Sequence, residues 1–265
     1  MDKQFDKKWQ KRVESGALTF GVKLSQEQLD ILTFHAQELI RWNKKFNITS
    51  IVDPFDVALK HFIDSIAIAP LIVSSSNINP KVIDLGSGGG FPGIPLKVVN
   101  PSIELVMVDS SAKKVSFLKY LISQSGILKT NSSKINSSTI NSFQTDNSQI
   151  NSSRIENISI SKNYSHSKGV EAIHCRAEEI CKMSNYAKQF DFVVSRAFTA
   201  LDRFTDMAIP FLKRDGCIIA MKGEVKEDEL APLRNRKDIK IDISEYYLPF
   251  EQHKRCVIKI SVVKL

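Results

Sequence analysis

An apolar segment that leads directly into a glycine-dense turn constrains this chain most. Residues 82–85 read Val-Ile-Asp-Leu, and residues 86–93 continue as Gly-Ser-Gly-Gly-Gly-Phe-Pro-Gly. Glycine takes up positive φ at little cost, and its bare backbone lets a ligand come close. A strand, a glycine turn and a helix in this order are typical of the first unit of a parallel α/β sheet. The sequence therefore predicts a ligand site at the carboxyl end of this strand.

The rest of the chain after residue 80 continues as alternating strands and helices. Helical stretches follow the first five expected strands, and the last two strands follow each other directly, which indicates an antiparallel hairpin at one sheet edge. We predict an α/β fold with a seven-stranded, mainly parallel sheet. This ending is usual for the class I (Rossmann-like) methyltransferase variant and unusual for nicotinamide-binding folds. The expected strands are 81–86, 104–109, 171–176, 190–196, 217–222, 241–248 and 256–263.

Residues 1–77 are predicted to form an N-terminal helical cap, ahead of a main domain at 78–265. Ser25 and Gln28 fit a capping box before an apolar helical repeat. Asp53-Pro54 offers an N-cap followed by a proline at the first helical position. The next helix brings His61, Asp64 and Ser65 onto one face, because residues three and four apart are neighbours.

Residues 129–168 differ from the rest in composition. They contain 12 Ser and 7 Asn, with an Asn-Ser-Ser-x-Ile unit that recurs. Such a segment has too little apolar content to offset its ordering entropy, so we expect a disordered surface insert. The basic excess of the chain, 37 Lys and Arg against 29 Asp and Glu, is concentrated here and in residues 1–12. Charge alone thus gives weak support for nucleic-acid binding.

Other sequence-wide features point to a cytoplasmic protein. No stretch is long and apolar enough for a membrane span, and no apolar segment follows the basic N-terminus as in a secretory signal. The four cysteines form no Cys-x-x-Cys pair, and no His/Cys/Asp cluster has the spacing of metal ligands. We therefore expect no metal and no membrane partner.

The glycine turn can be interpreted in two ways. Gly88, Gly90 and Gly93 satisfy a loose dinucleotide pattern. If the pattern is instead aligned with the end of the strand, it begins at Gly86-x-Gly88, and its third glycine position is occupied by Phe91. The ring of Phe91 would crowd a pyrophosphate but would tolerate a compact nucleoside such as S-adenosylmethionine. Asp109 ends the next strand, where a carboxylate binds ribose hydroxyls or, alternatively, caps the following helix.

The end of the fourth strand, Ser195-Arg196-Ala197-Phe198, is informative through what it lacks. It has no Asn/Asp-Pro-Pro-Tyr/Phe turn of the kind that enzymes methylating exocyclic amines place there. No cysteine adjoins a proline, as pyrimidine C5 methylation commonly requires, and no Ser/His/Asp nucleophile signature is present. The remaining acceptor class is one that is already nucleophilic, such as an aromatic ring nitrogen.

Taken together, these segments resemble the RsmG (GidB) family of bacterial 16S ribosomal RNA guanine-N7 methyltransferases. The resemblance covers about residues 24 to 260 apart from the insert. It implies S-adenosylmethionine as cofactor and 16S rRNA, in the small subunit or an assembly intermediate, as partner. The matching segments are residues 42–49 (Trp-Asn-Lys-Lys-Phe-Asn-Ile-Thr), 61–65, 84–95, 108–110, 176–179, 195–197 and 222–223.

The resemblance also assigns candidate residues. Cofactor contacts are expected at Gly86, Phe91, Ala177, Glu178 and Arg196, joined by Asp84, Gly88 and Asp109 of the glycine turn and the second strand. On the substrate side the candidates are Arg196, Lys222, His61, Asp64 and Arg255, with His253 as an alternative to Arg255. Alternatives stay open for several of them: His61 and Asp64 either brace the sheet or contact RNA, and Arg196 either holds the cofactor or an RNA phosphate or pairs with a structural carboxylate. Lys222 is a candidate for an RNA phosphate, and the basic N-terminal arm either contacts the RNA backbone or stays solvated.

Guanine N7 has a free lone pair and loses no proton on methylation, so we expect no general base and assign no catalytic residue. A monomer is expected. Two rival functions stay open at this point. One is a nicotinamide oxidoreductase that uses Gly88, Gly90 and Gly93, against which Phe91 argues. The other is a non-catalytic RNA-binding module with a vestigial nucleoside pocket.

Overall fold

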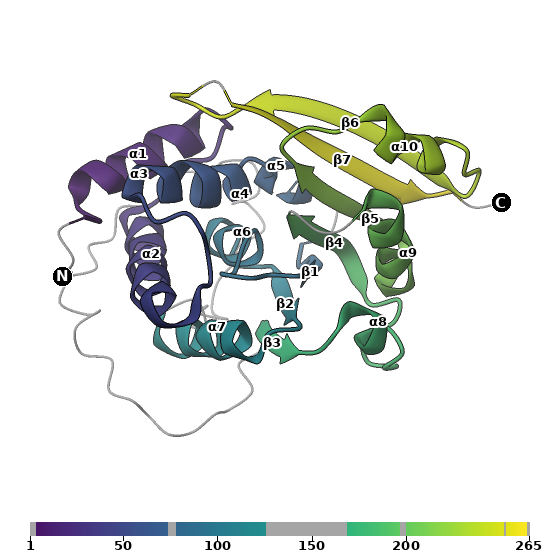
Figure 1. The fold of residues 1–265 in the computed structure, drawn as a ribbon, viewed down its shortest axis with the longest axis horizontal. Helices are drawn as coiled ribbons and strands as arrows, with labels where there is room; N and C mark the ends of the chain where they lie inside the picture. Colours follow the sequence, from purple (N-terminus) through teal and green to yellow (C-terminus); the bar gives the residue numbers. More distant parts are fainter. Residues whose placement is uncertain (1–3, 74–77, 126–168, 197–199, 252, 264–265) are drawn as a thin grey trace.

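The computed structural model describes residues 4–73, 78–125, 169–196, 200–251 and 253–263. Its centre is a seven-stranded sheet with the strand order β3-β2-β1-β4-β5-β7-β6 (Figure 1). The strands are β1 (Lys81–Leu85), β2 (Glu104–Asp109), β3 (Val170–His174), β4 (Phe190–Arg196), β5 (Leu212–Lys222), β6 (Ile239–Tyr247) and β7 (Lys254–Val262).

The sheet confirms the predicted topology. Strands β1 to β5 pair in parallel, whereas β7 runs antiparallel to both β5 and β6. The chain thus ends in an antiparallel hairpin at one edge. Because β1 and β4 are neighbours while β2 and β3 lie on the other side of β1, the strand order reverses between β1 and β4. Ligands of open α/β sheets bind at such a reversal, beyond the carboxyl ends of the strands.

Helices cover both faces of the sheet. Inward residues of one face, such as Val82 and Val194, pack in one core with the N-terminal helices and with α6 and α7. Residues of the opposite face, such as Ile83 and Val193, pack with α8, α9 and α10. The alternation follows from the two-residue period of a strand. The later helices are α6 (Gly93–Val99), α7 (Ala112–Gln124), α8 (Ala177–Ile180), α9 (Leu201–Ala208), η5 (Ile209–Phe211) and α10 (Glu227–Arg234).

The N-terminal region is helical, as predicted. Helix α2 begins with a complete capping box, in which Ser25 and Gln28 each accept a hydrogen bond from the other's backbone N–H. Asp53 caps the next helix, and Pro54 is its first residue. This helix contains a π-helical stretch that the sequence did not indicate. The elements are α1 (Lys7–Leu18), α2 (Gln26–Phe46), α3 (Pro54–Val57), η1 (Ala58–Ile63, π-helical), α4 (Asp64–Ile66) and α5 (Ala69–Val73).

Strands β2 and β4 have the predicted bounds, β1, β3, β6 and β7 differ from them by one or two residues at an end, and β5 differs most. Strand β5 begins at Leu212, five residues earlier than expected, and its register with β4 shifts between Phe190 and Phe192. The charged residues at 213–215 concealed this start, because they interrupt the apolar pattern. Strand β3 ends at His174, and Arg176 is the N-cap of α8 rather than a strand residue.

The proposed boundary near residue 77 and the expected insert at 129–168 lie outside the described residues, so both stay predictions. Among the described residues, no helix combines the length and apolarity that a membrane span requires.

Candidate functional site

The glycine turn after β1 is held by the neighbouring strand. The backbone N–H groups of Gly86 and Ser87 both donate to the carbonyl of Val108, at 2.8 and 3.1 Å. Gly88 has φ +56°, and its N–H donates to Oδ2 of Asp109 at 2.9 Å. A Cβ placed on Gly88 would meet only the Gly86 carbonyl oxygen, at 3.9 Å. The turn therefore leaves open space above its backbone, which suits a closely bound ligand.

Asp109 links this turn to the start of α7. Its Oδ1 accepts the N–H of Ser111 at 2.8 Å, and Ser111, not Asp109, is the N-cap residue of α7. The carboxylate is buried, and each oxygen accepts one of these backbone bonds. Each oxygen keeps a further lone pair, so the geometry is compatible with the predicted ribose contact.

Asp84 lies under the same turn and is fully buried. Its Oδ2 accepts the N–H of Gly93 at 3.0 Å, while Oδ1 has no hydrogen-bond partner among the described residues. Burial raises the pKa of this carboxyl from 3.8 to about 7, although the hydrogen bond from Gly93 opposes the shift. A buried, unpaired carboxylate oxygen is costly unless it receives a proton or a cationic partner.

The ring of Phe91 is clamped between two imidazoles. His35 and His61 stack on it with ring centroids 4.7 and 4.6 Å away. Nε2 of His35 lies 2.7 Å from the Gly89 carbonyl oxygen and must donate to it, because a carbonyl only accepts. Burial lowers the pKa of His35 to about 4, so the imidazole is neutral at neutral pH. The Phe91 side chain is thus buried packing, and any cofactor contact there involves its backbone or ring edge.

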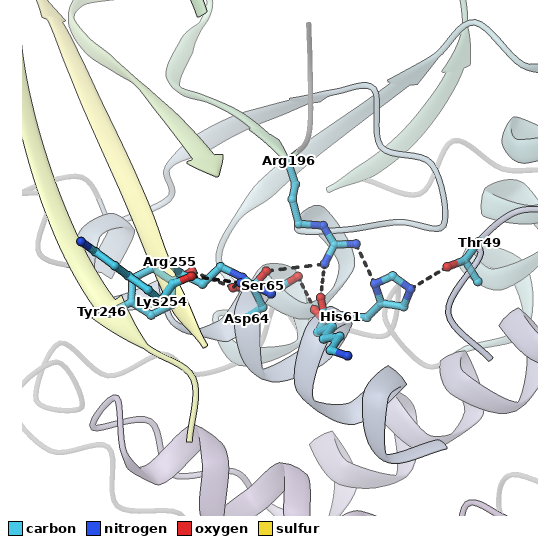
Figure 2. A network of polar contacts seen from close by, with 9 residues as sticks. Thr49, His61, Asp64, Ser65, Arg196, Tyr246, Lys254 and Arg255 are labelled. Atoms are coloured by element: carbon cyan, nitrogen blue, oxygen red, sulfur yellow. Dashed lines mark hydrogen bonds and ion pairs between the residues drawn. The ribbon is translucent and has the colours of Figure 1, made fainter. Parts of the chain in front are cut away.

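Arg196, at the end of β4, joins the helix that carries His61 to the sheet (Figure 2). Its Nη1 donates to the Lys60 carbonyl at 2.6 Å, and its Nη2 donates to Nδ1 of His61 at 2.8 Å. The guanidinium also lies 5.1 Å from the Phe91 ring centroid. His61 in turn contacts Oγ1 of Thr49 through Nε2 at 2.8 Å.

Asp64 extends this network toward the β6–β7 hairpin (Figure 2). Its Oδ1 accepts the hydroxyl of Tyr246 at 2.7 Å and lies 3.6 Å from Nε of Arg255, while Oδ2 lies 3.9 Å from Nη1 of Arg196. Burial raises the pKa of Asp64, and Arg196, Tyr246 and Arg255 counteract this. His61 and Asp64 share a helix face as predicted, and they are joined through Arg196.

The remaining predicted residues lie as follows. Lys222 forms a 2.7 Å ion pair with Glu229 of α10. His253 is paired with Glu251 at 2.9 Å, so Arg255 rather than His253 joins the Asp64 network. Ala177 is buried at the start of α8, and the next residue, Glu178, is exposed. Gly86, the first residue of the glycine turn, is also exposed.

Sequence reasoning missed two residues of this arrangement. His35 falls at helical spacing from Leu32 and Leu39 on the apolar face of α2, and a histidine there was a usable signal. Tyr246 carried no signal, because its partner Asp64 is 182 positions away in the chain. Within the described ranges, no group of three or more His, Cys, Asp or Glu residues could hold a metal ion.

The strand order, the glycine turn and the buried acid at the end of β2, Asp109, define a class I S-adenosylmethionine-dependent methyltransferase fold. Two solved structures share it: an O-methyltransferase from Bacillus cereus (TM-score 0.52, 11% identity, 87% of this chain and 91% of that chain) and a SAM-dependent methyltransferase from Aquifex aeolicus (TM-score 0.50, 14% identity, 82% and 97%).

The family follows from sequence. The GidB family, rRNA small subunit methyltransferase G, matches residues 28–148 and 151–257. The curated "Ribosomal RNA small subunit methyltransferase G" of Acetivibrio thermocellus is 34% identical, over 96% of this chain and 88% of its own length. Its counterpart in Geobacter sp. strain M21 is 32% identical, over 94% and 95%. The chain belongs to the GidB family and is an S-adenosylmethionine-dependent rRNA methyltransferase.

Proposed function

We propose that this chain transfers a methyl group from S-adenosylmethionine to N7 of a guanine in 16S rRNA, without a general base. The observation that supports it is the pair of guanidinium groups around Asp64. Arg196 and Arg255, both expected on the substrate side, lie 3.9 and 3.6 Å from its carboxylate oxygens, and a guanidinium only donates hydrogen bonds. The major-groove edge of guanine presents two acceptors, O6 and N7. Donors directed at O6 would orient the ring while N7 stays free.

The acceptor explains why no base is needed. When bound, S-adenosylmethionine supplies a methyl group on a positively charged sulfur. In the reaction the sulfur–methyl bond breaks as the N7–methyl bond forms, and positive charge moves to the purine without loss of a proton. The protein then contributes alignment and the exclusion of water.

The cofactor side is assigned to the glycine turn and its two acids. We propose that the open backbone of Gly86 and Gly88 carries the cofactor, and that Asp109 accepts hydrogen bonds from its ribose. Asp84 lies buried beneath this turn with an unpaired Oδ1, and we propose that its carboxylate receives a cationic group of the cofactor. Ala177 and Glu178 follow β3, where folds of this class contact the adenine. Arg196 completes the set at the end of β4.

The residues of the clamp are positioning residues in this proposal. His35 and His61 hold Phe91 from both sides, and His35 also holds the carbonyl of Gly89 in the turn. Lys222 is oriented by Glu229, so a phosphate contact would have to share its ammonium group with that carboxylate. We also propose a monomeric, cytoplasmic enzyme whose substrate is the small subunit or an assembly intermediate.

The test uses purified protein, labelled S-adenosylmethionine and small ribosomal subunits from a strain that lacks the endogenous activity. Nuclease digestion and nucleoside analysis should yield 7-methylguanosine. Arg196→Ala and Asp109→Ala should abolish it, whereas the exposed control Lys182→Ala should not. Naked 16S rRNA assayed in parallel identifies the substrate form. Cofactor binding without any methylated nucleoside would contradict the proposal and favour a binding module.

A further inference from the structure

The carboxyl half of α2 and the adjoining helix α7 form a strongly basic surface outside the site described above. Residues 38–46 and 112–124 contain six Lys or Arg and one acid, Glu38, whereas the whole chain has 37 against 29. We call the surface the α2–α7 basic face. Its exposed cations are Arg41, Lys44, Lys45, Lys113 and Lys119.

Aromatic packing joins the two helices into one surface. The ring of Trp42 lies 5.6 Å from that of Phe117 and 5.4 Å from that of Tyr120. Nη2 of Arg41 donates to the Tyr120 hydroxyl at 2.8 Å, across the helix pair. Cations contributed by α2 and by α7 therefore lie on one pair of packed helices.

Helix electrostatics accounts for only part of this charge. Lys44 and Lys45 lie in the last turn of α2, where a cation complements the helix dipole. Lys113 and Lys114 lie in the first turn of α7, which has no acidic residue and where a cation is unfavourable. A basic first turn costs helix stability unless an anion lies close to it.

At the start of α7 the protein supplies one anion, the buried carboxylate of Asp109, which accepts the Ser111 N–H at 2.8 Å. Glu38 forms an ion pair with Arg41. In the described part of the chain, Lys44, Lys45, Lys113 and Lys119 form no ion pair. The Lys113 ammonium group lies 6.0 Å from the centre of the Phe46 ring, which is 37% exposed.

The face also adjoins the candidate site. Helix α2 ends at Phe46, and the turn that follows is fixed by a 2.8 Å hydrogen bond from the Thr49 N–H to Oδ1 of Asn43. The hydroxyl of this same Thr49 contacts His61. On the other helix, Lys113 follows Asp109 by four residues. A chain of negative charges lying on the face would thus continue directly to the glycine turn.

We propose that the α2–α7 basic face binds the phosphodiester backbone of the 16S rRNA next to the target guanine. This inference rests on the proposed function and names the surface that holds its substrate. Lysines are suited to this role because a phosphate contact needs a point charge and no base-specific geometry. Such contacts release counterions, so binding through them weakens as salt concentration rises.

The test compares a triple variant, Lys44→Gln/Lys45→Gln/Lys113→Gln, with a matched control of equal charge change, Lys182→Gln/Lys188→Gln/Arg214→Gln. The control residues are exposed and lie outside the face. Filter binding to small subunits and to naked 16S rRNA is measured between 50 and 200 mM salt, roughly the range over which phosphate contacts dominate. Cofactor affinity and thermal unfolding verify that each variant is folded.

For the triple variant we expect the slope of log affinity against log salt to become shallower by about 2 to 3, since each lost phosphate contact removes about 1. The KM for RNA should rise about tenfold or more, and the control should match the wild type. An unchanged slope in the triple variant, or an equal effect in the control, would overturn the proposal. Binding is measured without methyl transfer, so a wild type that makes no 7-methylguanosine refutes the proposed function separately.

Discussion

Nδ1 of His61 accepts a hydrogen bond from Nη2 of Arg196 at 2.8 Å, and this contact determines the state of the imidazole. Because a guanidinium only donates, Nδ1 is unprotonated, and Nε2 carries the hydrogen that Thr49 accepts. Burial, followed by the charge of Arg196, lowers the pKa of His61 to about 2. His61 is thus a neutral, fixed connector between the π-helical stretch and β4.

Arg196→Lys should separate charge from geometry at this connector. A lysine keeps the positive charge but cannot reach both the Lys60 carbonyl and His61 Nδ1, which Arg196 contacts at 2.6 and 2.8 Å. The unpaired buried acceptor should cost roughly 1–3 kcal/mol in the free energy of unfolding. Methyl transfer should fall at least about tenfold, the equivalent of about 1.4 kcal/mol in the barrier.

Urea denaturation and the labelled-methyl assay measure the two effects of Arg196→Lys. Arg214→Lys is the matched control, because Arg214 is exposed on β5. If Arg196→Lys showed wild-type unfolding and wild-type turnover, the two-point contact would have no role in stability or catalysis.

His35→Gln should change how stability depends on pH. The pKa of His35 is lowered from 6.5 to about 4, so between these values the unfolded chain binds a proton that the folded chain does not. The contribution of neutral His35 to the free energy of unfolding is therefore fully present above pH 6.5. It is lost as the pH falls toward 4, by about 1.4 kcal/mol per pH unit. Glutamine keeps a donor for the Gly89 carbonyl but does not titrate.

The slope of unfolding free energy against pH, measured with urea between pH 4.5 and 6.5, should therefore be smaller by about 1.4 kcal/mol per unit in His35→Gln. Asp84 titrates in the opposite direction, because its pKa is raised to about 7, but it does so in both proteins and cancels. His253→Gln, at an exposed position, controls for loss of an imidazole. Parallel slopes in His35→Gln and the wild type would rule out a neutral buried His35.

The fold was largely predictable because its signals are local. Apolar runs predicted all seven strands, and the missing helix before the last strand predicted the hairpin. Ser25 and Gln28 predicted the start of α2 from a pattern of four residues. The beginning of β5 was missed because charged residues at 213–215 interrupt its apolar pattern. Only the pairing with β4, whose register shifts between Phe190 and Phe192, defines this part of the strand.

The site was predictable as a set of residues but not as a network. Asp84, Asp109 and Arg196 lie in the carboxyl-terminal parts of β1, β2 and β4, and the carboxyl ends of parallel strands share one edge of the sheet. The clamp on Phe91 depends on His35 and His61 from two separate helices, and the Asp64–Tyr246 contact spans most of the chain. His61 lies in the π-helical stretch Ala58–Ile63, which the sequence periodicity did not indicate.

Asp84→Asn should remove a pH dependence of cofactor binding. With a pKa of about 7, Asp84 is largely protonated below neutrality in the free protein, and a cationic ligand group must displace that proton. The Kd for S-adenosylmethionine should therefore rise about tenfold per pH unit as the pH falls below 7. Asparagine cannot ionise, so its Kd should be weaker at pH 8 and nearly constant with pH.

Calorimetric titration of Asp84→Asn and wild type from pH 5.5 to 8.5 tests this. Asp202→Asn serves as the control, since Asp202 lies on α9, on the opposite face of the sheet. A wild-type Kd that does not change across pH 7 would remove Asp84 from the cofactor contacts.

Turnover at saturating cofactor and RNA should vary little between pH 6.5 and 9. Guanine N7 releases no proton on methylation. The imidazole of His61 is not available as a base, because its Nδ1 is occupied by Arg196 and its pKa is lowered to about 2. Titration of Asp84 should appear in the KM for S-adenosylmethionine and not in kcat, since saturation compensates for weaker binding.

Single-turnover methyl transfer, measured with rapid quenching, separates the chemical step from product release. Wild type and Asp84→Asn should then give nearly flat, parallel profiles of the transfer rate against pH. A fall in the wild-type rate through one pKa near 7 that disappears on replacing a single side chain at the site would instead identify a general base and refute the base-free reaction.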